Sequence, residues 1–340
     1  MVCKFCAEDR VDRRRGDKTR RGKALRDEQG GCNFCCDTFQ VCHEIVLFER
    51  ADYTLDAGKI WHMNFDLKTA SDQPLPDLVQ ALNRGFEDYL VPIHLNVPQF
   101  LAMVRKDSID LTASRLLCVD DKPEGVALIA RRGWVSRLAA MGISKGLRGK
   151  GAGSWLMGKL IQQARERGDH EMTLEVIEQN DAAVHLYEKF NFQTMRRLVG
   201  FIRREAIELE PEELKEIDLR EMGALVSQFG LRDLPWQISG ETIAQMTPPV
   251  RAYSNGQSYV AVSNPEADHV VIWSVLVEPQ ARGMNLGTHV LKQVIAKFTG
   301  RTWHVPAVYP EELSGVFERA GFELEQLSQW QMCLSLSPSA

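Results

Sequence analysis

Three glycines at alternating positions stand directly before a helical pattern in the first half of the chain. They are Gly149, Gly151 and Gly153, and Arg148 precedes them. A strand, a glycine loop and a helix in this order point backbone N–H groups and the positive end of the helix dipole at one place. Glycine places no side chain there, so these residues predict an anion site. An ordinary tight turn is the alternative for a glycine cluster taken alone.

The spacing of the loop excludes two common phosphate-binding patterns. A P-loop requires a lysine after its second glycine, but Ala152 follows Gly151. A dinucleotide-binding loop requires a third glycine where this chain has Ser154. The loop therefore belongs to another class of anion site.

The elements that would position this loop are a buried strand and an amphipathic helix. Residues 135–143 are mostly apolar and short, as in a buried strand. After the loop, apolar residues recur at helical spacing, and Gly168 is a typical C-terminal stop for a helix. The apolar stripe consists of Met157, Leu160, Ile161 and Ala164.

The same plan occurs a second time further along the chain. Arg282, Gly283 and Gly287 stand where the first half has its arginine and its first and third loop glycines. An apolar strand pattern precedes them, and a helical stripe follows, as in the first half. In both halves a second helical stripe then leads to Asn or Gly followed by Phe, and these two residues tolerate a left-handed helix exit. The repeat predicts two tandem α/β domains.

The repeat also indicates where the units begin and end. Met63 starts a pattern of strand, turn and helix, so the first unit is expected over residues 63–203. An acidic segment with a proline forms the expected linker, residues 204–216, and the second unit is expected over 217–340. We expect an α/β (α+β) fold, in which each unit holds a mixed twisted sheet flanked by helices.

The first 62 residues differ from the rest of the chain. Two C-x2-C pairs, formed by Cys3, Cys6, Cys32 and Cys35, have the spacing of a zinc site. A basic run lies between the pairs, so such a module would have nucleic acid as its natural partner. However, this segment shows no sustained period of 2 or 3.6 residues. We expect residues 1–62 to be a disordered or spurious extension without a metal, and a zinc module is the alternative.

The composition sets broad limits on function. The 340 residues are 44% hydrophobic and 26% charged, which is ordinary for globular proteins. A net charge of −5 provides no general attraction to nucleic acid or to anionic membranes. No apolar run reaches the roughly 18 residues of a spanning helix, and there is no secretory signal. We expect a cytoplasmic protein with no membrane partner, and its oligomeric state stays open.

Two motifs of the first half resemble the GNAT N-acetyltransferases. The run R-G-K-G-A-G at residues 148–153 is similar to the [QR]-x-x-G-x-[GA] motif of that family. Residues 180–192 fit its N-x-x-A-x-x-L-Y-x-x-x-[GN]-F pattern. The resemblance covers about residues 63–203, and it is weaker over about 217–336. It implies two tandem GNAT-type domains.

The resemblance implies acetyl-CoA as co-substrate, with no metal. In that family, the loop and the start of the helix hold the pyrophosphate through backbone N–H groups. The preceding strand binds the pantetheine arm and polarises the thioester carbonyl, while Arg148 and Lys150 would add positive charge at the rim. The implied cofactor-binding residues are Met141, Gly142, Ile143, Arg148, Gly149, Lys150, Gly151, Ala152, Gly153, Asn180 and Tyr187.

The resemblance also implies a base and an acid. An amine must lose a proton before it attacks a thioester, and the departing thiolate benefits from an acid. Glu175 and Tyr187 match the glutamate and tyrosine of the ribosomal-protein α-amino acetyltransferase branch. A water relay is the alternative base, and a core tyrosine and a solvent-facing glutamate are the structural alternatives. Asn180 is expected to order the connection between strand and helix.

The second half departs from the pattern at the residues that would carry the chemistry. Asn285, Val305 and Phe317 stand where the first half has Gly151, the glutamate and the tyrosine. We therefore expect a degenerate second domain.

The sequence as a whole predicts an acyltransferase that moves an acetyl group from acetyl-CoA to a primary amine of a small molecule or protein. The alternative is a non-catalytic acyl-CoA-binding or interaction protein. Acceptor loops are expected in the helical stretch 78–104, and the acceptor itself is not predicted.

Overall fold

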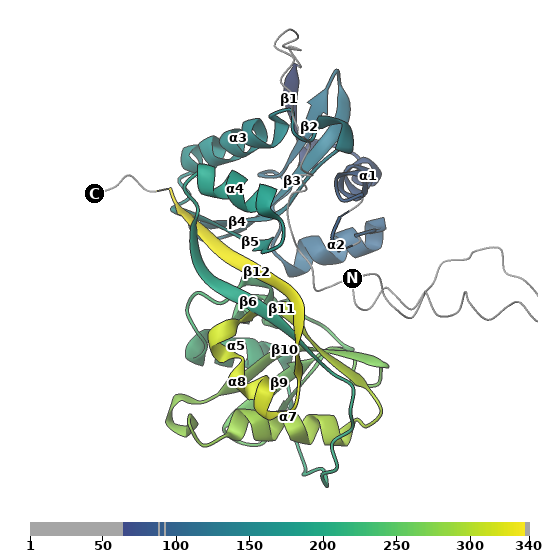
Figure 1. Ribbon diagram of the computed structural model, residues 1–340, viewed down its shortest axis with the longest axis vertical. Helices are drawn as coiled ribbons and strands as arrows, with labels where there is room; N and C mark the ends of the chain where they lie inside the picture. The colour runs from purple at the N-terminus through teal and green to yellow at the C-terminus, as the bar shows by residue number, and fades with distance from the viewer. Residues whose placement is uncertain (1–63, 88, 92, 337–340) are drawn as a thin grey trace, which may run out of the picture.

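The computed structural model describes residues 64–87, 89–91 and 93–336. The extension 1–62, with its cysteine pairs, lies outside the described residues. The described strands form one twelve-stranded sheet in the order β1-β2-β3-β4-β5-β12-β6-β11-β10-β9-β8-β7. Figure 1 shows the first half of the chain above the second, with β6 and β12 running through both.

The first half follows the order expected from the sequence. Strands β1 to β4 are antiparallel neighbours, and β5 is parallel to β4. In Figure 1, α3 and α4 lie on one side of these strands, and α1 and α2 lie on the other. The elements are β1 (Phe65–Thr69), η4 (Ala70–Asp72), α1 (Leu75–Gly85), α2 (Val97–Lys106), β2 (Arg115–Val119), β3 (Lys122–Arg132), β4 (Val135–Ile143), η5 (Lys145–Leu147), α3 (Ala152–Glu166), β5 (Glu171–Ile177), α4 (Asp181–Lys189) and β6 (Gln193–Arg203).

The second half repeats this plan, which confirms the internal repeat. Strands β7 to β10 are antiparallel neighbours, and β11 is parallel to β10. The elements are β7 (Lys215–Ile217), α5 (Leu219–Phe229), η6 (Trp236–Ile238), α6 (Gly240–Gln245), β8 (Arg251–Ser254), β9 (Ser258–Val262), β10 (His269–Val277), η7 (Pro279–Ala281), α7 (Leu286–Lys297), β11 (Thr302–Pro310), η8 (Glu311–Leu313), α8 (Gly315–Arg319) and β12 (Glu323–Ser335).

The two halves exchange their last strands. β5 pairs with β12 along its whole length, from Glu171 opposite Ser335 to Ile177 opposite Gln329. β11 pairs in turn with β6, and β6 and β12 pair with each other. The sheet of each half is therefore completed by a strand from the other half. We keep 63–203, 204–216 and 217–340 as proposed bounds of the repeated units and their linker.

The expected helical stretch 78–104 consists of two helices and a connection. α1 ends at Gly85, and α2 begins at Val97. Asn96 and Gln99 form a capping box at the start of α2, with each side chain accepting from the other residue's backbone N–H, which fixes a new helix start there. Phe86 and Phe100, which lie on either side of this connection, are both buried in the core.

Candidate active site

The strands β4 and β5 form a fork in the first half. They pair only where Val135 to Arg137 meet Glu171 to Thr173, and no further pairing joins them among the described residues. β4 has a bulge at Ala139, because Leu138 and Ala140 pair with consecutive residues of β3. A bulge bends its strand and increases the local twist. Beyond Arg137, the edge of β4 that faces β5 therefore has no strand partner in the described part of the chain.

The expected pantetheine-binding residues lie along this free edge. Met141, Gly142 and Ile143 pair with β3 on the other side of the strand. Gly142 also packs against Gly85 at the end of α1, where an added Cβ would lie 2.8 Å from the Gly142 backbone. Glycine at both places lets the helix approach the strand closely.

The glycine loop connects the open end of the fork to α3. Gly149 and Gly151 adopt φ values of 73° and 83°, and Gly151 is the N-cap of the 15-residue helix. Both values lie in the left-handed region that glycine adopts at low cost. Ala152 and Gly153 form the buried first turn of α3, whose leading N–H groups have no partner within the helix. The loop thus has the geometry expected of an anion cradle.

Arg148 does not take the expected place at the rim of the loop. Its Nε donates to the carbonyl of Ile143 at 3.0 Å, and its Nη2 donates to the carbonyls of Gly85 and Glu87 at 3.2 and 3.1 Å. The guanidinium therefore ties the end of β4 to the end of α1 and holds the loop in place. Lys150, which is exposed, is left as the charged side chain of the loop itself.

Glu175 lies in the interior, so the solvent-facing alternative for this residue is wrong. It is only 1% exposed, and it forms an ion pair with fully buried Arg137. Arg137 donates through Nε at 2.7 Å and approaches through Nη2 at 2.5 Å, both to Oε2 of Glu175. This pair stands at the base of the fork, next to the last paired residues of β4 and β5. A carboxylate in this setting needs either a moving water or a local opening to reach an amine.

Tyr187 lies on α4, and Asn180 immediately precedes this helix. The Tyr187 ring is fully buried and packs edge-on against Phe192, with ring centroids 5.7 Å apart. Asn180 is the N-cap of the helix, and its side chain accepts from the N–H of Ala183 at 3.2 Å. This cap explains the expected ordering role of Asn180.

Two polar residues at the fork were not singled out from the sequence. Arg137 carried a signal, since a charged residue inside the apolar strand 135–143 requires a buried partner. Gln237 carried none, because it lies in the other half of the chain. Its Nε2 donates to Oε2 of Glu175 at 3.2 Å.

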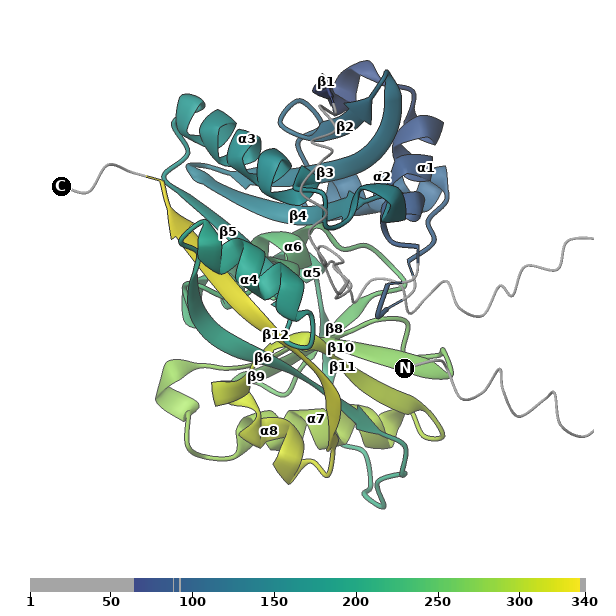
Figure 2. The same cartoon turned by 45° about the horizontal axis from the view of Figure 1, so that its top comes forward.

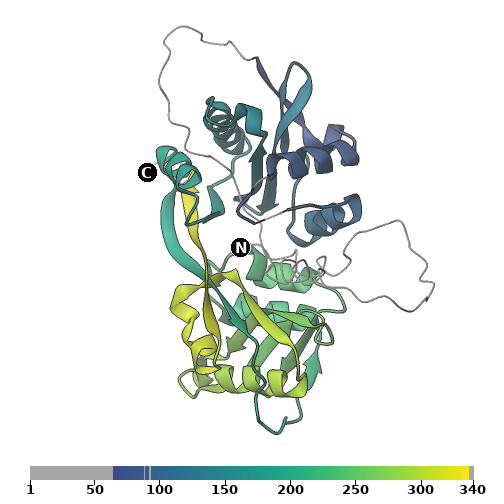
Figure 3. The same cartoon turned by 45° about the vertical axis from the view of Figure 1, so that its right-hand side comes forward.

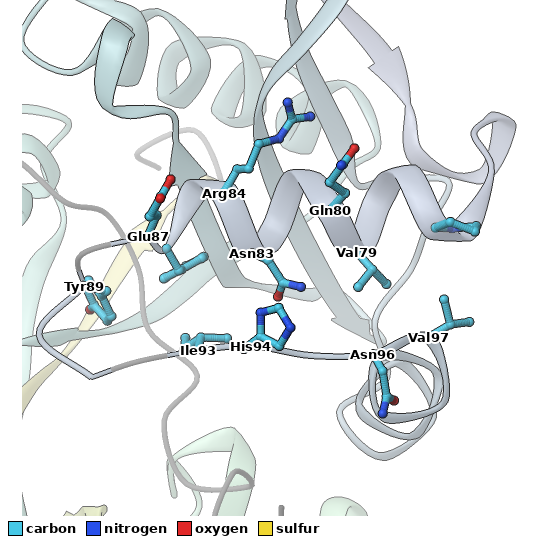
Figure 4. Close-up of a pocket in the computed structure, with 12 residues that line it drawn as sticks. Val79, Gln80, Asn83, Arg84, Glu87, Tyr89, Ile93, His94, Asn96 and Val97 are labelled. Atoms are coloured by element: carbon cyan, nitrogen blue, oxygen red, sulfur yellow. The ribbon is translucent and has the colours of Figure 1, made fainter. Parts of the chain in front are cut away.

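A cavity of about 750 Å³ lies beside α1 and the connection to α2 (Figure 4). Asn83 closes one side by exchanging two hydrogen bonds of 2.9 Å with the backbone of Leu95. Figure 4 shows His94 below Asn83, with Glu87 near the end of α1 that contacts β4. The cavity is therefore next to the fork, in the region where acceptor loops were expected.

The second half has a fork of the same kind. β10 and β11 pair only over three residues each, and β10 has its bulge at Trp273. Gly283 and Asn285 of its loop adopt φ values of 81° and 61°. Arg282 donates to the carbonyls of Val277 and Phe229. It thus joins the end of a strand to the end of a helix, as Arg148 does with other residues in the first half. A cavity of about 730 Å³ lies along this loop and the end of β10.

Neither a membrane span nor a metal site is found in the part of the chain that the structure describes. None of its helices combines the length and the apolar character that crossing a membrane requires. Within the same residues, no three His, Cys, Asp or Glu side chains are grouped so that they could hold a metal ion.

Comparison with known proteins identifies the first half. Residues 80–192 match the model of the Acetyltransferase (GNAT) family. No curated protein matches the chain.

Solved structures show the same fold over most of the chain. A putative acetyltransferase from Pyrococcus horikoshii has 14% identity, covers 84% of this chain and 93% of its own, and has a TM-score of 0.56. A GCN5-related N-acetyltransferase from Sphaerobacter thermophilus has 14% identity, coverage of 81% and 97%, and a TM-score of 0.58. A tandem GNAT protein from the clavulanic acid biosynthesis pathway has 16% identity, coverage of 82% and 100%, and a TM-score of 0.53. Residues 80–192 therefore form a domain of the GNAT acetyltransferase family, within a chain that has the fold of these solved structures.

Proposed function

We propose that the first half transfers an acetyl group from acetyl-CoA to a primary amine. The observation that carries this proposal is the fork between β4 and β5, which opens onto the glycine loop at the start of α3. One edge of the fork offers backbone groups for an extended chain, and the loop offers N–H groups for phosphates. The length and the chemistry of acetyl-CoA suit these two parts in that order.

The backbone would bind the co-substrate. The N–H groups of residues 149–153 would hold the pyrophosphate, and exposed Lys150 would add a positive charge. The free edge at Met141, Gly142 and Ile143 would pair with the pantetheine arm and polarise the thioester carbonyl. The amine nitrogen then forms a bond to the acetyl carbon, and the bond from that carbon to sulfur breaks.

Two side chains would handle the protons. We assign Glu175, through a water, as the base that removes a proton from the attacking amine, because Arg137 holds its carboxylate at the base of the fork. We assign Tyr187 as the acid that protonates the departing thiolate. Asn180 would serve through the start of α4, which it caps. The cavity beside α1 is the proposed entrance for the acceptor.

A thiol-release assay tests this function. The chain is incubated with acetyl-CoA and a panel of amines that includes small amines, amino acids and peptides with free N-termini. We expect thiol release that depends on an amine of this panel, with an acetylated product of matching mass. Tight acetyl-CoA binding without amine-dependent release would contradict the enzyme.

One observation favours the non-catalytic alternative. Glu175 is 1% exposed and occupied by an ion pair, as in a residue that serves only the interior. A protein that binds acyl-CoA without transferring the acyl group would show calorimetric binding of acetyl-CoA and no acetylated product. The same protein sample therefore separates the two functions.

A further inference from the structure

We propose that Gln237, from the second half, is a positioning residue that fixes the carboxylate of Glu175 in the first half. The site at the fork is then built from both halves of the chain. This inference rests on the proposed function, since it assigns Glu175 a task in the reaction.

Two residues, one from each half of the chain, contact the same oxygen of Glu175. Gln237 donates through Nε2 at 3.2 Å, and Arg137 contacts the same Oε2 through Nε and Nη2 at 2.7 and 2.5 Å. Both of these side-chain hydrogen bonds go to Oε2, and neither goes to the other oxygen, Oε1. The donors thus determine which oxygen is held and leave Oε1 as the acceptor for an amine or a water.

The turn that carries Gln237 is anchored on the first half. Trp236 donates through Nε1 to the carbonyl of Asp107 at 2.8 Å, and the Arg132 guanidinium lies 4.2 Å from the centre of a Trp236 ring. Arg132 also donates to the hydroxyls of Ser239 and Thr242, each at 2.7 Å. In Figures 2 and 3, the helices on either side of this turn lie between the two halves. Gln237 is therefore held at Glu175 by contacts that do not involve Glu175.

Packing alone does not require this polar group. Gln237 is fully buried, and its Oε1 has no hydrogen-bond partner among the described residues. The same is true of Nη1 and Nη2 of Arg137, although Nη2 lies in ion-pair contact with Glu175. Unpaired buried polar atoms cost free energy that apolar side chains avoid. The fork of the second half shows the apolar solution, with Val271 and Val305 buried at the matching places. The polar residues Arg137, Glu175 and Gln237 in the first half therefore have a role beyond filling the interior.

The orientation of the carboxylate has a direct consequence for proton transfer. A base acts only when its free oxygen lies within hydrogen-bond reach of the proton that it removes. Without the Gln237 donor, Arg137 alone contacts Oε2, so the carboxylate of Glu175 is held less firmly in the orientation that presents Oε1 to the amine or its water. We expect a lower kcat with unchanged acetyl-CoA affinity, since the loop and the β4 edge are not touched.

The test compares Gln237→Met with a matched control. Gln293, on α7, is another buried glutamine, and its side chain accepts a hydrogen bond from the N–H of Glu212 at 2.7 Å. Gln293→Met removes this side chain in the same way. With the amine that gives thiol release, we expect Gln237→Met to lower kcat about tenfold while Kd for acetyl-CoA stays constant. Gln293→Met should keep the wild-type kcat. Equal kcat in Gln237→Met and wild type, or equal losses in both variants, would overturn the inference.

A second variant separates positioning from packing. Gln237→Glu keeps the shape and donates a hydrogen bond only while it is protonated. As the pH rises, the new carboxylate ionises and repels Glu175, since two adjacent carboxylates cannot both ionise without cost. We expect kcat near the wild-type value at low pH and a steeper loss than wild type as the pH rises. A pH profile parallel to that of wild type would contradict the positioning role.

A urea double-mutant cycle keeps the inference testable without turnover. If the wild-type chain binds acetyl-CoA but releases no thiol, the proposed function fails for every variant. The cycle of Glu175→Gln and Gln237→Met then tests the contact itself. A non-additive shift in the unfolding midpoint supports the positioning of Glu175 by Gln237, and additive shifts overturn it.

Discussion

The two forks of the molecule share a backbone and differ in their side chains. Both have a bulged strand that leaves its parallel neighbour, a loop with two left-handed residues, and an arginine that ties the strand end to a helix end. At the base of the first fork stands the ion pair of Arg137 and Glu175, whereas Val271 and Val305 are buried in the second. The second fork folds with valines at these places, so the scaffold does not require the ion pair. This is what we expect if the pair serves the proposed reaction.

In the second fork, the side chain of Tyr309 on β11 reaches across to the backbone of β10. The Tyr309 hydroxyl lies 3.3 Å from both the N–H and the carbonyl of Val275, on the edge of β10 that corresponds to the proposed pantetheine edge. Burial raises the pKa of Tyr309 to about 12, so this hydroxyl stays neutral at ordinary pH. A ligand in the second fork must displace this contact first.

The largest expected effect comes from removing the strand that joins the halves. A chain that ends at Phe322 lacks β12, so β5 and β6 each lose a partner. We expect neither half to fold, because buried backbone groups without partners are costly. Circular dichroism and urea unfolding would show this loss. A cooperative transition in the truncated chain would mean that the halves are independent.

The next largest effect comes from converting the first fork into the second. Glu175→Val leaves Arg137 buried without its partner, and we expect a loss of about 3–5 kcal/mol in the free energy of unfolding. Adding Arg137→Val should recover most of that loss, since an apolar pair avoids the desolvation penalty. The double variant should remain inactive. Equal stability losses in the single and double variants would contradict this account.

A smaller effect is expected at the tyrosine. Tyr187→Phe keeps the ring that packs on Phe192 and removes the hydroxyl, as in Phe317 of the second half, whose ring centroid lies 5.8 Å from that of Phe322. We expect turnover to fall on the order of 10²-fold with little change in acetyl-CoA affinity. Pre-steady-state kinetics would measure the chemical step directly. Unchanged turnover when chemistry is rate-limiting would leave Tyr187 as a core residue.

The smallest effect is expected at the loop. A Cβ on Gly151 would meet no atom within 4 Å, and Asn285 adopts the same left-handed conformation in the second half. Gly151→Asn should therefore fold normally and weaken acetyl-CoA binding about tenfold through its side chain alone. Asn285→Gly should create no activity. Calorimetric titration of acetyl-CoA into both variants shows which loop binds the co-substrate. If only Asn285→Gly lost binding, the second loop and not the first would be the binding loop.

Much of the fold follows from local patterns in the sequence. The expected strand 135–143 is β4, and the glycine loop ends where α3 begins. These features depend on residues close together in the chain, such as the stripe of α3 and the cap at Asn180. The repeated plan was visible for the same reason.

Other features depend on residues that are far apart in sequence. An apolar strand pattern shows that a strand is buried, but it does not specify its neighbour, so the exchange of β6 and β12 could not be predicted. The family resemblance implied that Arg148 would add charge at the rim of the phosphate site, yet its side chain donates to a carbonyl 63 positions away. Gln237 likewise contacts Glu175 although 62 positions separate them, and no local pattern in the sequence marks such a contact.

The exchanged strands set an order of events during synthesis. Glu178, next to β5, and Ser328, on β12, are hydrogen-bonded although 150 positions separate them. At about 5–20 residues per second, a ribosome needs roughly 8–30 s to add that stretch. Until then, β5 presents an unpaired edge to every other nascent chain nearby, and such edges invite exchange between molecules. The synthesis of β12 therefore ends this exposure, and the rate of translation sets how long the exposure lasts.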